Sequence, residues 1–395
     1  MRPSRHVFLL SILILAGCRR ERAGFEPYRV SPVILISIDT LRADHLPQYG
    51  YGAVETPNID ALARDGVVFE HAWSHCPMTL PSHVSMLTGE LPTTHGVRNN
   101  LGFRYEPAKH QSISQRLQRA GYATGAAVSA YVLRGETGLR DAFQWYDDAI
   151  DASPGARFRD YQRSGFTTTS LAKRWIDSIG TKPFFLFLHL YEPHVPYEPP
   201  EPFRSRYANA YDGEIATADA IVGDLIRHLK QRSLYDNAII VLTSDHGEGL
   251  GDHGEAQHSI LLYTETIRVP LIVKLPHREK GGTRSATPAA LSDIAPTIAS
   301  LVHLEPVKTD GVDLFGELPE SRLIYAETVY PYVQLGWSNL SAIINGPLHY
   351  IQGPRSELYD AVTDPYERID VIAGHRRDAA LFRAATGEIS ASDER

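Results

Sequence analysis

The sequence predicts an α/β fold: a large, mostly parallel central sheet flanked by helices, followed by a small antiparallel sheet with one helix. Apolar runs of strand length alternate with segments of helical periodicity, which is typical of a parallel sheet covered by helices on both faces. The apolar runs are continuous instead of alternating with polar residues, as expected for strands buried on both faces. From about residue 305 the pattern changes to short strand-like segments.

The expected strands of the central sheet are rich in β-branched and aromatic residues. In chain order they are VILISID (33–39), a weaker candidate GYATGAAVS (121–129), FFLFLHL (184–190), AIIVLTSD (238–245) and VPLIVKL (269–275). Two of them end on acids, Asp39 and Asp245, and His189 lies near the end of a third. Ligands of open parallel sheets gather beyond the carboxyl ends of the strands, so we expect these side chains at one rim.

The expected helices lie between these strands and begin or end on typical residues. Segment 57–66 starts with Pro and ends with Gly, and segment 112–121 also ends with Gly. Segment 212–231 repeats apolar residues at helical spacing, and segment 292–302 follows the last strand. These segments complete the strand and helix alternation of an α/β domain expected over residues 32–304.

The C-terminal part is expected to form a separate α+β subdomain over residues 305–385. The runs RLIYAET, LSAIING and PLHYI predict a small antiparallel sheet, and a closing helix is expected at about 366–385. The last residues, 386–395, are polar and are expected to be disordered.

The N-terminus has the pattern of a targeting segment. Arg2 and Arg5 precede the apolar run VFLLSILILAG, which is short for a membrane span and fits a signal-peptide core. The ending LAGC (15–18) resembles a bacterial lipobox, which implies cleavage before Cys18 and lipid attachment to it. The alternative is a plain secretory signal with an incidental cysteine. We expect a signal peptide with lipobox at 1–18, a tether at 19–31, and a lipid-anchored protein of the bacterial cell envelope, on its periplasmic face or outer surface.

Composition narrows the classes of function. The chain has 395 residues, 43% hydrophobic and 22% charged, with a formal net charge of −8. No stretch is rich in Lys and Arg, so nucleic acid is not an expected partner. After cleavage before a lipidated Cys18, Cys76 would have no partner for an intramolecular disulfide.

The segment SDHGEGLGDHGEAQH (244–258) predicts a metal site. Asp245 and His246 would offer a carboxylate and an imidazole from one strand end, while the glycines allow tight turns around the site. Asp39 could supply a third ligand and a hydroxyl oxygen a fourth. Oxygen and imidazole ligands suit Zn, Mn, Mg or Ca. The alternative, a polar surface turn, fits Asp252 or Glu255 better than the adjacent Asp-His pair.

The segment CPMTLPSHVSMLTG (76–89) predicts the nucleophile. Pro81 fits the first turn of a helix and Gly89 its C-terminal cap, so Thr79 is expected just before the helix. The N–H groups and dipole at a helix start favour an anion, and a divalent cation would make the threonine hydroxyl a stronger nucleophile. Cys76 lies upstream of this helix start and is expected to be a small buried apolar residue.

Motifs along nearly the whole chain resemble the sulfatase family of the alkaline-phosphatase superfamily. They are SIDTLRADHL, TPNIDALARDGVVFEHA, TLPSHVSMLTGELPTTHGV, HLYEPHVPYEPP, SDHGE, RVPLIV, SDIAPTI and ELYDAVTDPYE, in family order over about residues 33–370. The family's nucleophile pattern, Cys/Ser-x-Pro-x-Arg, becomes Thr79-Leu80-Pro81-Ser82-His83 here. Formylglycine, the family's oxidised Cys or Ser, is therefore not expected. The second of two consecutive aspartates and a Gly-Lys-x-His element, which sulfatases usually carry, are also missing.

A second resemblance, to nucleotide pyrophosphatase/phosphodiesterases of the same superfamily, covers the T-x-P-x-H stretch. It implies that Asn100 donates to the developing oxyanion, with Asn99 as the alternative. By resemblance, His189, His194 and His258 would reach the site, where they could bind substrate oxygens, protonate the leaving group or hold a second cation.

Together these residues predict a metal-dependent hydrolase of sulfate or phosphate and phosphonate esters. Asp39, Thr79, Asp245 and His246 would hold the cation, Thr79 would form a covalent intermediate, and Asn100 and His258 would assist. Phospho-esters are favoured over sulfate esters because formylglycine is not expected. The expected substrate is a small anionic ester or an envelope glycan or lipid. The alternative is a transferase that moves a phospho-headgroup onto an envelope glycan or lipid.

Overall fold

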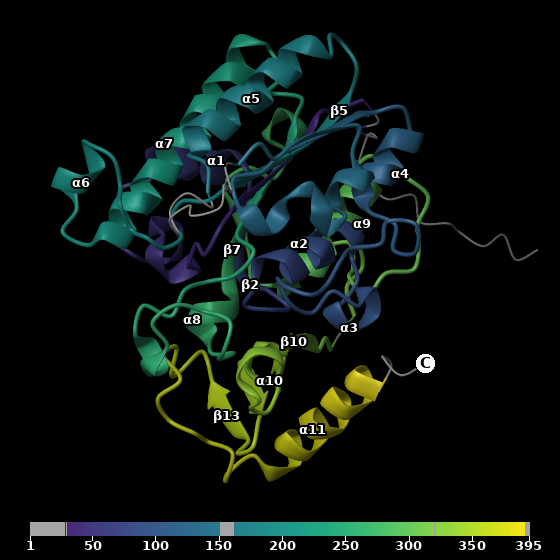
Figure 1. Ribbon diagram of the computed structural model, residues 1–395. Helices are drawn as coiled ribbons and strands as arrows, with labels where there is room; N and C mark the ends of the chain where they lie inside the picture. The colour runs from purple at the N-terminus through teal and green to yellow at the C-terminus, as the bar shows by residue number, and fades with distance from the viewer. Residues whose placement is uncertain (1–27, 29, 151–161, 320, 392–395) are drawn as a thin grey trace, which may run out of the picture.

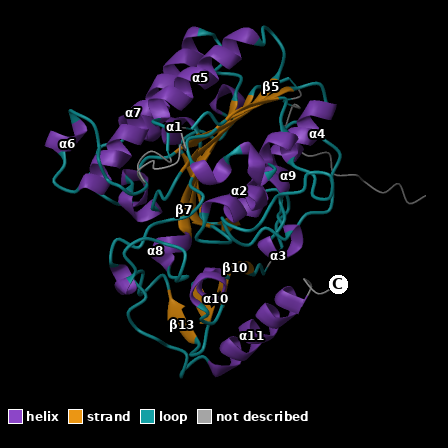
Figure 2. Ribbon diagram, in the orientation of Figure 1, coloured by secondary structure: helices purple, strands orange, loops and turns teal. Residues whose placement is uncertain are grey.

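The computed structural model describes residues 28, 30–150, 162–319 and 321–391. The expected signal peptide and most of the tether therefore lie outside the described residues. A central nine-stranded sheet is sandwiched between helices, and a four-stranded sheet with α11 packs at one end of the molecule (Figure 1, Figure 2). This confirms the predicted fold class. None of the helices in the described part of the chain combines the length and apolar character that a membrane span requires.

The central sheet has the strand order β4-β3-β5-β1-β6-β7-β2-β8, with β9 paired to β2. Its middle strands β5, β1 and β6 are parallel and their ends lie in register. The strand bounds are β1 Val33–Ile38, β2 Val67–Trp73, β3 Ala123–Ala127, β4 Trp145–Asp147, β5 Phe184–Leu190, β6 Ile239–Thr243, β7 Arg268–Lys274, β8 Thr283–Ser285 and β9 Ala289–Ala290.

Two features of this sheet differ from the sequence-based expectation. Strand β7 runs antiparallel to both of its neighbours, β6 and β2. A continuous apolar run shows that a strand is buried but does not show its direction. Strand β2 was not predicted, because Glu70 and His71 interrupt its apolar pattern at a register shift between Phe69 and Ala72. The strands β4, β8 and β9 were not predicted either, since they have only two or three residues each.

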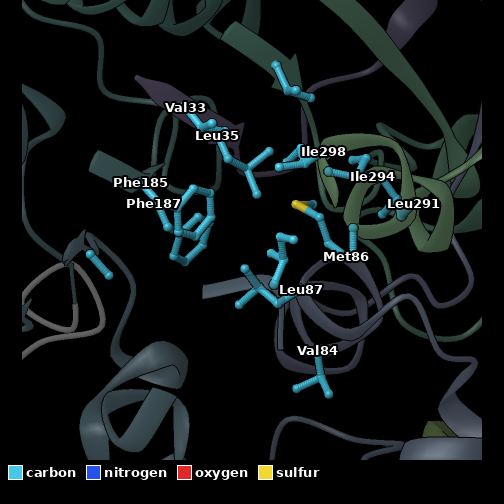
Figure 3. Packing of buried hydrophobic residues seen from close by; sticks show 14 of the residues in the cluster. Val33, Leu35, Val84, Met86, Leu87, Phe185, Phe187, Leu291, Ile294 and Ile298 are labelled. Atoms are coloured by element: carbon cyan, nitrogen blue, oxygen red, sulfur yellow. The ribbon is translucent and has the colours of Figure 1, made fainter. Parts of the chain in front are cut away.

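Helices cover both faces of the sheet (Figure 1). One face packs against α1 Pro57–Asp65, α5 Gly165–Ser178 and α7 Ala210–Gln231, and the other against α2 Thr79–Thr88, α4 Ile113–Arg119 and α9 Ile294–Leu301. Alternate side chains of β1 pack into two hydrophobic cores, one on each face of the sheet. Val33 and Leu35 face α2 and α9, while Ile34 and Ile36 face α1, α5 and α7. Figure 3 shows the first of these cores, in which Met86 and Leu87 of α2 lie close to Val33 and Leu35.

Helix α2 is buried along its whole length, which fixes the position of its first residue. Gly89 ends the helix with a left-handed φ of 79°, and its N–H donates to Ser85 O at 2.9 Å, as the sequence predicted. The helix begins at Thr79 itself, with Met78 as the N-cap, so the expectation that Thr79 precedes the helix was wrong by one residue. Pro81 is consequently the third helical residue, where its missing N–H breaks no intrahelical bond.

The small sheet has the antiparallel order β10-β11-β12-β13. Its strands are β10 Ile324–Thr328, β11 Leu340–Asn345, β12 Leu348–Gln352 and β13 Glu357–Asp360, and the remaining short helices are α3 Pro92–His95, α6 Phe203–Arg206, α8 Thr264–Ile267 and α10 Tyr330–Leu335. The closing helix, α11, spans Arg376–Ala391 and not 366–385. The tail expected to be disordered from 386 is therefore helical up to Ala391, and 392–395 lie outside the described residues.

Asp219 of α7 caps the start of a different helix, α1. Its carboxylate accepts the backbone N–H groups of Asn58, at 3.0 Å, and of Ile59, at 2.7 Å, and also the Asn58 side-chain amide, at 2.7 Å. Asp219→Ala would leave these donors buried without an acceptor, so we expect the free energy of unfolding to fall by about 2 kcal/mol. Urea denaturation measures the change. Asp219→Asn keeps one acceptor oxygen and should lose less, whereas equal losses for both variants would contradict the capping role.

Candidate active site

Three predicted metal ligands meet at the carboxyl edge of the central sheet. Asp39 directly follows β1, and Asp245 and His246 follow the adjacent parallel strand β6. All three residues are fully buried. Nε2 of His246 lies 3.8 Å from Oδ1 of Asp39 and 3.4 Å from Oδ2 of Asp245. Residues two hundred positions apart thus form one cluster because their strands pair in register.

Thr79 joins this cluster from the start of helix α2. Its Oγ1 lies 3.4 Å from Nε2 of His246, and the residue is 2% exposed. As the first residue of α2, it stands where the helix dipole and unpaired N–H groups stabilise negative charge. The sequence-based prediction of these four residues as one site therefore has a geometry that supports it.

The donor atoms fit a divalent cation. Four ligands held at about 2.0–2.1 Å from a zinc-sized ion lie roughly 3.3 Å from one another. Nε2 of His246 lies 3.4 Å from Thr79 Oγ1, 3.4 Å from Asp245 Oδ2 and 3.8 Å from Asp39 Oδ1, which is close to that spacing. Both carboxylate oxygens of Asp39 and Oδ2 of Asp245 are buried without a hydrogen-bond partner in the described part of the chain. Buried carboxylate oxygens without protein donors are what a cation site requires.

The charges of the cluster lead to the same conclusion. Burial raises the pKa of Asp39 well above its usual range, and the nearby Asp245 carboxylate adds to the rise. Burial also opposes ionisation of Asp245, but His246, His83 and His189 together lower its pKa to about 2. Two carboxylates this close favour a single negative charge unless a cation compensates both.

The loop after His246 orients its ring. Nδ1 of His246 donates to the carbonyl of Gly247 at 2.9 Å, which leaves the Nε2 lone pair facing the carboxylates. A Cβ at Gly247 would lie 2.0 Å from the carbonyl oxygen of Glu265, and one at Gly249 would lie 2.2 Å from that of Glu255. Only glycine allows the loop to fold back this closely, so the glycines seen in the sequence are explained by close backbone approach.

Asn100 lies at the start of α2. Its Oδ1 accepts the backbone N–H of Leu80 at 2.8 Å, which orients the side-chain amide at the residue after Thr79. Asn99, the alternative oxyanion donor, is 1% exposed and accepts the N–H of Leu101 at 3.2 Å through its own Oδ1. The contact to Leu80 places Asn100 beside Thr79, while Nδ2 of Asn99 is buried without a hydrogen-bond partner in the described part of the chain, so both asparagines stay candidates for the donor.

The three histidines predicted to reach the site occupy two different positions. His189 is fully buried, with Nε2 3.4 Å from Oδ2 of Asp39, a position that favours support of that carboxylate over direct contact with substrate. His194 and His258 lie next to each other, with ring centroids 5.2 Å apart, and the centroid of the His258 ring lies 4.4 Å from that of His246. Burial lowers the pKa of His194 to about 3 and that of His258 to about 4, so both rings are neutral at neutral pH.

Two supporting residues had no assigned role in the sequence-based prediction. His83 donates from Nδ1 to the carbonyl of Thr79 at 2.7 Å, and its Nε2 accepts from the Ser37 hydroxyl at 2.8 Å, so it ties the start of α2 to β1. Glu248 accepts from Nδ1 of His258 at 3.0 Å and from the Tyr197 hydroxyl at 2.9 Å. His83, His189 and Asp245 also cluster closely enough to suggest a second cation, but both ring nitrogens of His83 already have partners.

Cys76 is fully buried and its environment is structural, as predicted. Burial raises the pKa of its thiol well above the usual value, which disfavours a thiolate. The carbonyl of Cys76 accepts hydroxyl hydrogens from Ser74, at 2.9 Å, and Ser82, at 2.7 Å, and these bonds shape the turn before α2.

A hydroxyl at a buried helix start, facing an Asp-Asp-His cluster at the edge of a mixed nine-stranded sheet, defines a hydrolase of the alkaline-phosphatase superfamily. Comparison with known proteins gives the family. The sulfatase family model matches residues 31–304, and the chain belongs to the sulfatase family. Its members and their superfamily relatives are metal-dependent hydrolases of sulfate or phosphate esters, so the chain is a hydrolase of this kind.

Individual relatives are distant but cover most of the chain. The ulvan-active sulfatase of Formosa agariphila is 27% identical over 86% of this chain and 76% of its own length. The phosphonate monoester hydrolase of Agrobacterium radiobacter superposes with a TM-score of 0.75 at 21% identity, covering 93% of this chain and 96% of its own. A protein solved with its substrate D-glucosamine-2-N,6-O-disulfate gives 0.76 at 19% identity, covering 92% and 98%.

Proposed function

We propose that the protein hydrolyses sulfate, phosphate or phosphonate esters through Thr79, with a covalent threonyl intermediate. The observation that carries this proposal is the 3.4 Å approach of the Thr79 hydroxyl to His246, within a cluster whose buried carboxylate oxygens lack other partners. Asp39, Asp245, His246 and Thr79 would hold a divalent cation. When bound, such a cation lowers the pKa of an alcohol and offsets the charge of an anionic ester.

In the first step, Oγ1 of Thr79 attacks phosphorus or sulfur, and the bond to the leaving oxygen breaks. The hydroxyl proton passes to Nε2 of His258. This nitrogen has an unprotonated lone pair, because Nδ1 carries the ring proton and donates it to Glu248. That proton then moves to the leaving oxygen. The Asn100 amide and the start of α2 stabilise the extra negative charge. In the second step, water attacks the same centre and releases Thr79, with His258 accepting a proton from the water and returning it to the threonine oxygen.

We favour phosphate and phosphonate esters over sulfate esters. Threonine replaces the residue that sulfatases convert to formylglycine, and no aldehyde hydrate can form on it to expel sulfate. A threonyl sulfate would have to be hydrolysed at sulfur. The relatives include both a sulfatase and a phosphonate monoester hydrolase, so the comparisons are consistent with either sulfate esters or phosphonate esters as substrates.

A panel of p-nitrophenyl esters tests this proposal. We expect the phosphonate monoester, the phosphate monoester or the bis-phosphate to be turned over at least tenfold more efficiently than the sulfate, measured as kcat/KM. Acid-quenched enzyme should carry a phosphoryl group on the peptide that contains Thr79, detected by mass spectrometry. Turnover of the sulfate alone would reverse the preferred substrate class, and an adduct on another residue would contradict the nucleophile assignment.

The transferase alternative is not favoured by any relative named above. The same panel distinguishes it, because a transferase would release p-nitrophenol faster when a sugar alcohol is added as acceptor, and the transferred group would appear on the sugar.

We also propose export and lipid attachment at Cys18, on the strength of the LAGC sequence. The tether would then link the lipid-modified Cys18 to the described domain and hold this domain at the envelope surface. Mass spectrometry of the N-terminal peptide from cells of the native host tests this, and an unmodified Cys18 would contradict it.

A further inference from the structure

A cavity of about 360 Å³ adjoins the candidate active site at His194. It is lined by the first turns of α5 and α7, two helices that lie next to each other (Figure 1), and by the loop that follows β5. The described lining residues are three glutamates, three residues with side-chain rings, two prolines and three uncharged polar residues, with no Lys or Arg among them. The glutamates are Glu192, Glu198 and Glu214, and the rings belong to Phe166, Tyr191 and His194. The cavity therefore gathers carboxylates without a basic side chain to match them.

Glu214 brings a buried carboxylate oxygen to this cavity that no protein group satisfies. The residue is 5% exposed, and its Oε1 accepts the backbone N–H of Glu198 at 2.9 Å. Its Oε2 is buried without a hydrogen-bond partner among the described residues. Glu214 is the fifth residue of α7, so it lies beyond the unpaired N–H groups of that helix start. A buried oxygen of this kind needs a partner, which a ligand in the cavity can supply.

Glu192 has a structural partner but adds to the negative charge. Its Oε1 accepts the N–H of Gly165, the first residue of α5, at 3.0 Å, while its Oε2 is buried and unpaired within the described ranges. Burial raises the pKa of Glu192. Burial, followed by the charge of Glu192, raises the pKa of Glu214 to about 8; the Glu198 carboxylate adds to the rise, while the Glu198 N–H and Arg204 oppose it. A positively charged ligand would favour the ionised form of both buried carboxylates.

Size and composition favour an organic ammonium group over a bare metal ion. In the described part of the chain, the groups of three or more close metal-ligand atoms contain none of these three glutamates. A volume of about 360 Å³ suits a small organic group. Phe166 and Tyr191 bring aromatic rings to the same cavity, and the faces of aromatic rings attract ammonium groups.

His194 connects the cavity to the reacting centre. Its ring centroid lies 5.2 Å from that of His258, which protonates the leaving oxygen in the proposed function. The same ring lies 4.5 Å, between centroids, from that of Tyr191, another residue that lines the cavity. A group bonded to the leaving oxygen would therefore extend past His258 towards the glutamates.

We propose that this cavity binds an ammonium group on the alcohol part of the substrate, so that the hydrolysed compound is an ester of an amino alcohol or of its quaternary analogue. This inference rests on the proposed function, because it places the leaving oxygen beside His258. A soluble ester and a lipid headgroup offer the same ammonium chemistry, and the substrates of the test distinguish these two sources.

The first test compares esters of the same shape with and without the positive charge. Choline phosphate carries the ammonium group, and 3,3-dimethylbutyl phosphate has carbon in place of the nitrogen; the corresponding pair of sulfate esters covers the other ester class. For at least one pair, we expect kcat/KM of the full chain to be about tenfold or more higher for the charged ester. Choline release from detergent-solubilised phosphatidylcholine, but not from choline phosphate, would support the ammonium site and place the group in a lipid.

Glu214→Gln is the test variant. Glutamine keeps an acceptor oxygen for the Glu198 N–H but cannot be ionised, so the ratio of kcat/KM for the charged ester to that for the neutral ester should fall to about one. Asp219→Asn is the matched control, because it neutralises another buried carboxylate of the same helix, and it should keep the ratio of the parent protein.

Binding is measured without turnover, through the melting temperature in tetramethylammonium chloride, with sodium chloride at equal concentration as the reference. Tetramethylammonium should raise the melting temperature of the parent protein by about 2 °C or more and leave that of Glu214→Gln unchanged. The shift in the parent protein should increase as the pH rises from about 7 to about 9, because the cation binds the ionised form of Glu214.

The inference is overturned if tetramethylammonium stabilises neither protein, or stabilises both equally. It is also overturned if Glu214→Gln removes stabilisation by calcium chloride but not by tetramethylammonium, because the cavity would then be a metal site. Equal turnover of the charged and neutral esters by the parent protein would overturn this inference and leave the proposed function intact. Stabilisation through Glu214 without turnover of any ester would support an ammonium site in this cavity and contradict the proposed function.

Discussion

Thr79→Ala is expected to lower kcat for the preferred ester by about 10⁴-fold or more, because it removes the attacking oxygen. The substitution takes one hydroxyl from the first residue of a buried helix and leaves the apolar contacts of α2 in place. Water in the emptied space could still attack, but it would lack the fixed position that Thr79 has beside His246. The measurement is steady-state turnover with p-nitrophenyl esters, together with the unfolding temperature of the variant.

Thr79→Ser is the matched control. It keeps the hydroxyl and should retain activity within about a hundredfold, since serine only lacks the methyl group that restricts the side-chain rotamer. Only the serine variant should form the acid-stable phosphoryl adduct. If alanine at this position left turnover unchanged, the nucleophile would lie elsewhere. If alanine and serine were equally inactive while both remained folded, the hydroxyl could not be the deciding group.

The parts of the site that follow from strand order could be predicted from the sequence. Asp39 and Asp245 were recognisable because each ends a continuous apolar run, and parallel strands place such ends at one edge. Thr79 was recognisable because Pro81 and Gly89 mark the two ends of α2. For the two aspartates, the local sequence fixes the strand and the geometry of parallel sheets fixes where its end lies. For Thr79, the local sequence indicates only where the helix begins.

The supporting contacts could not be predicted in the same way. His83 holds the Thr79 carbonyl against Ser37 of β1, a pairing that depends on how α2 packs on the sheet. Glu248 stood within a recognised motif, but its contact with His258 depends on the close backbone approach at Gly249. Strand β2 and the start of α11 were missed for a related reason, since their apolar patterns are short or interrupted and tertiary contacts decide their ends.

Removal of the divalent cation is expected to abolish turnover, by at least 10³-fold, and to destabilise the fold. Without a cation, burial raises the pKa of Asp39, and the nearby carboxylate of Asp245 in the same fully buried site raises it further. A cation at a hundred times its Kd would stabilise the native state by about 2.7 kcal/mol. Chelation followed by differential scanning calorimetry, with Zn, Mn, Mg or Ca added back singly, measures both effects and identifies the metal.

Asp39→Asn separates this electrostatic argument from a general loss of structure. The amide removes one of two facing carboxylates, so the cation-free variant should melt at a higher temperature than the cation-free parent protein, although its activity is lost. Added cation should then stabilise it little. Asp219→Asn is the control, since that buried aspartate caps α1, is not a candidate cation ligand, and should lower the melting temperature with and without cation alike. If Asp39→Asn destabilised the cation-free protein as Asp219→Asn does, the Asp39 carboxylate would be held by the protein itself, and the cation site would have to be sought elsewhere.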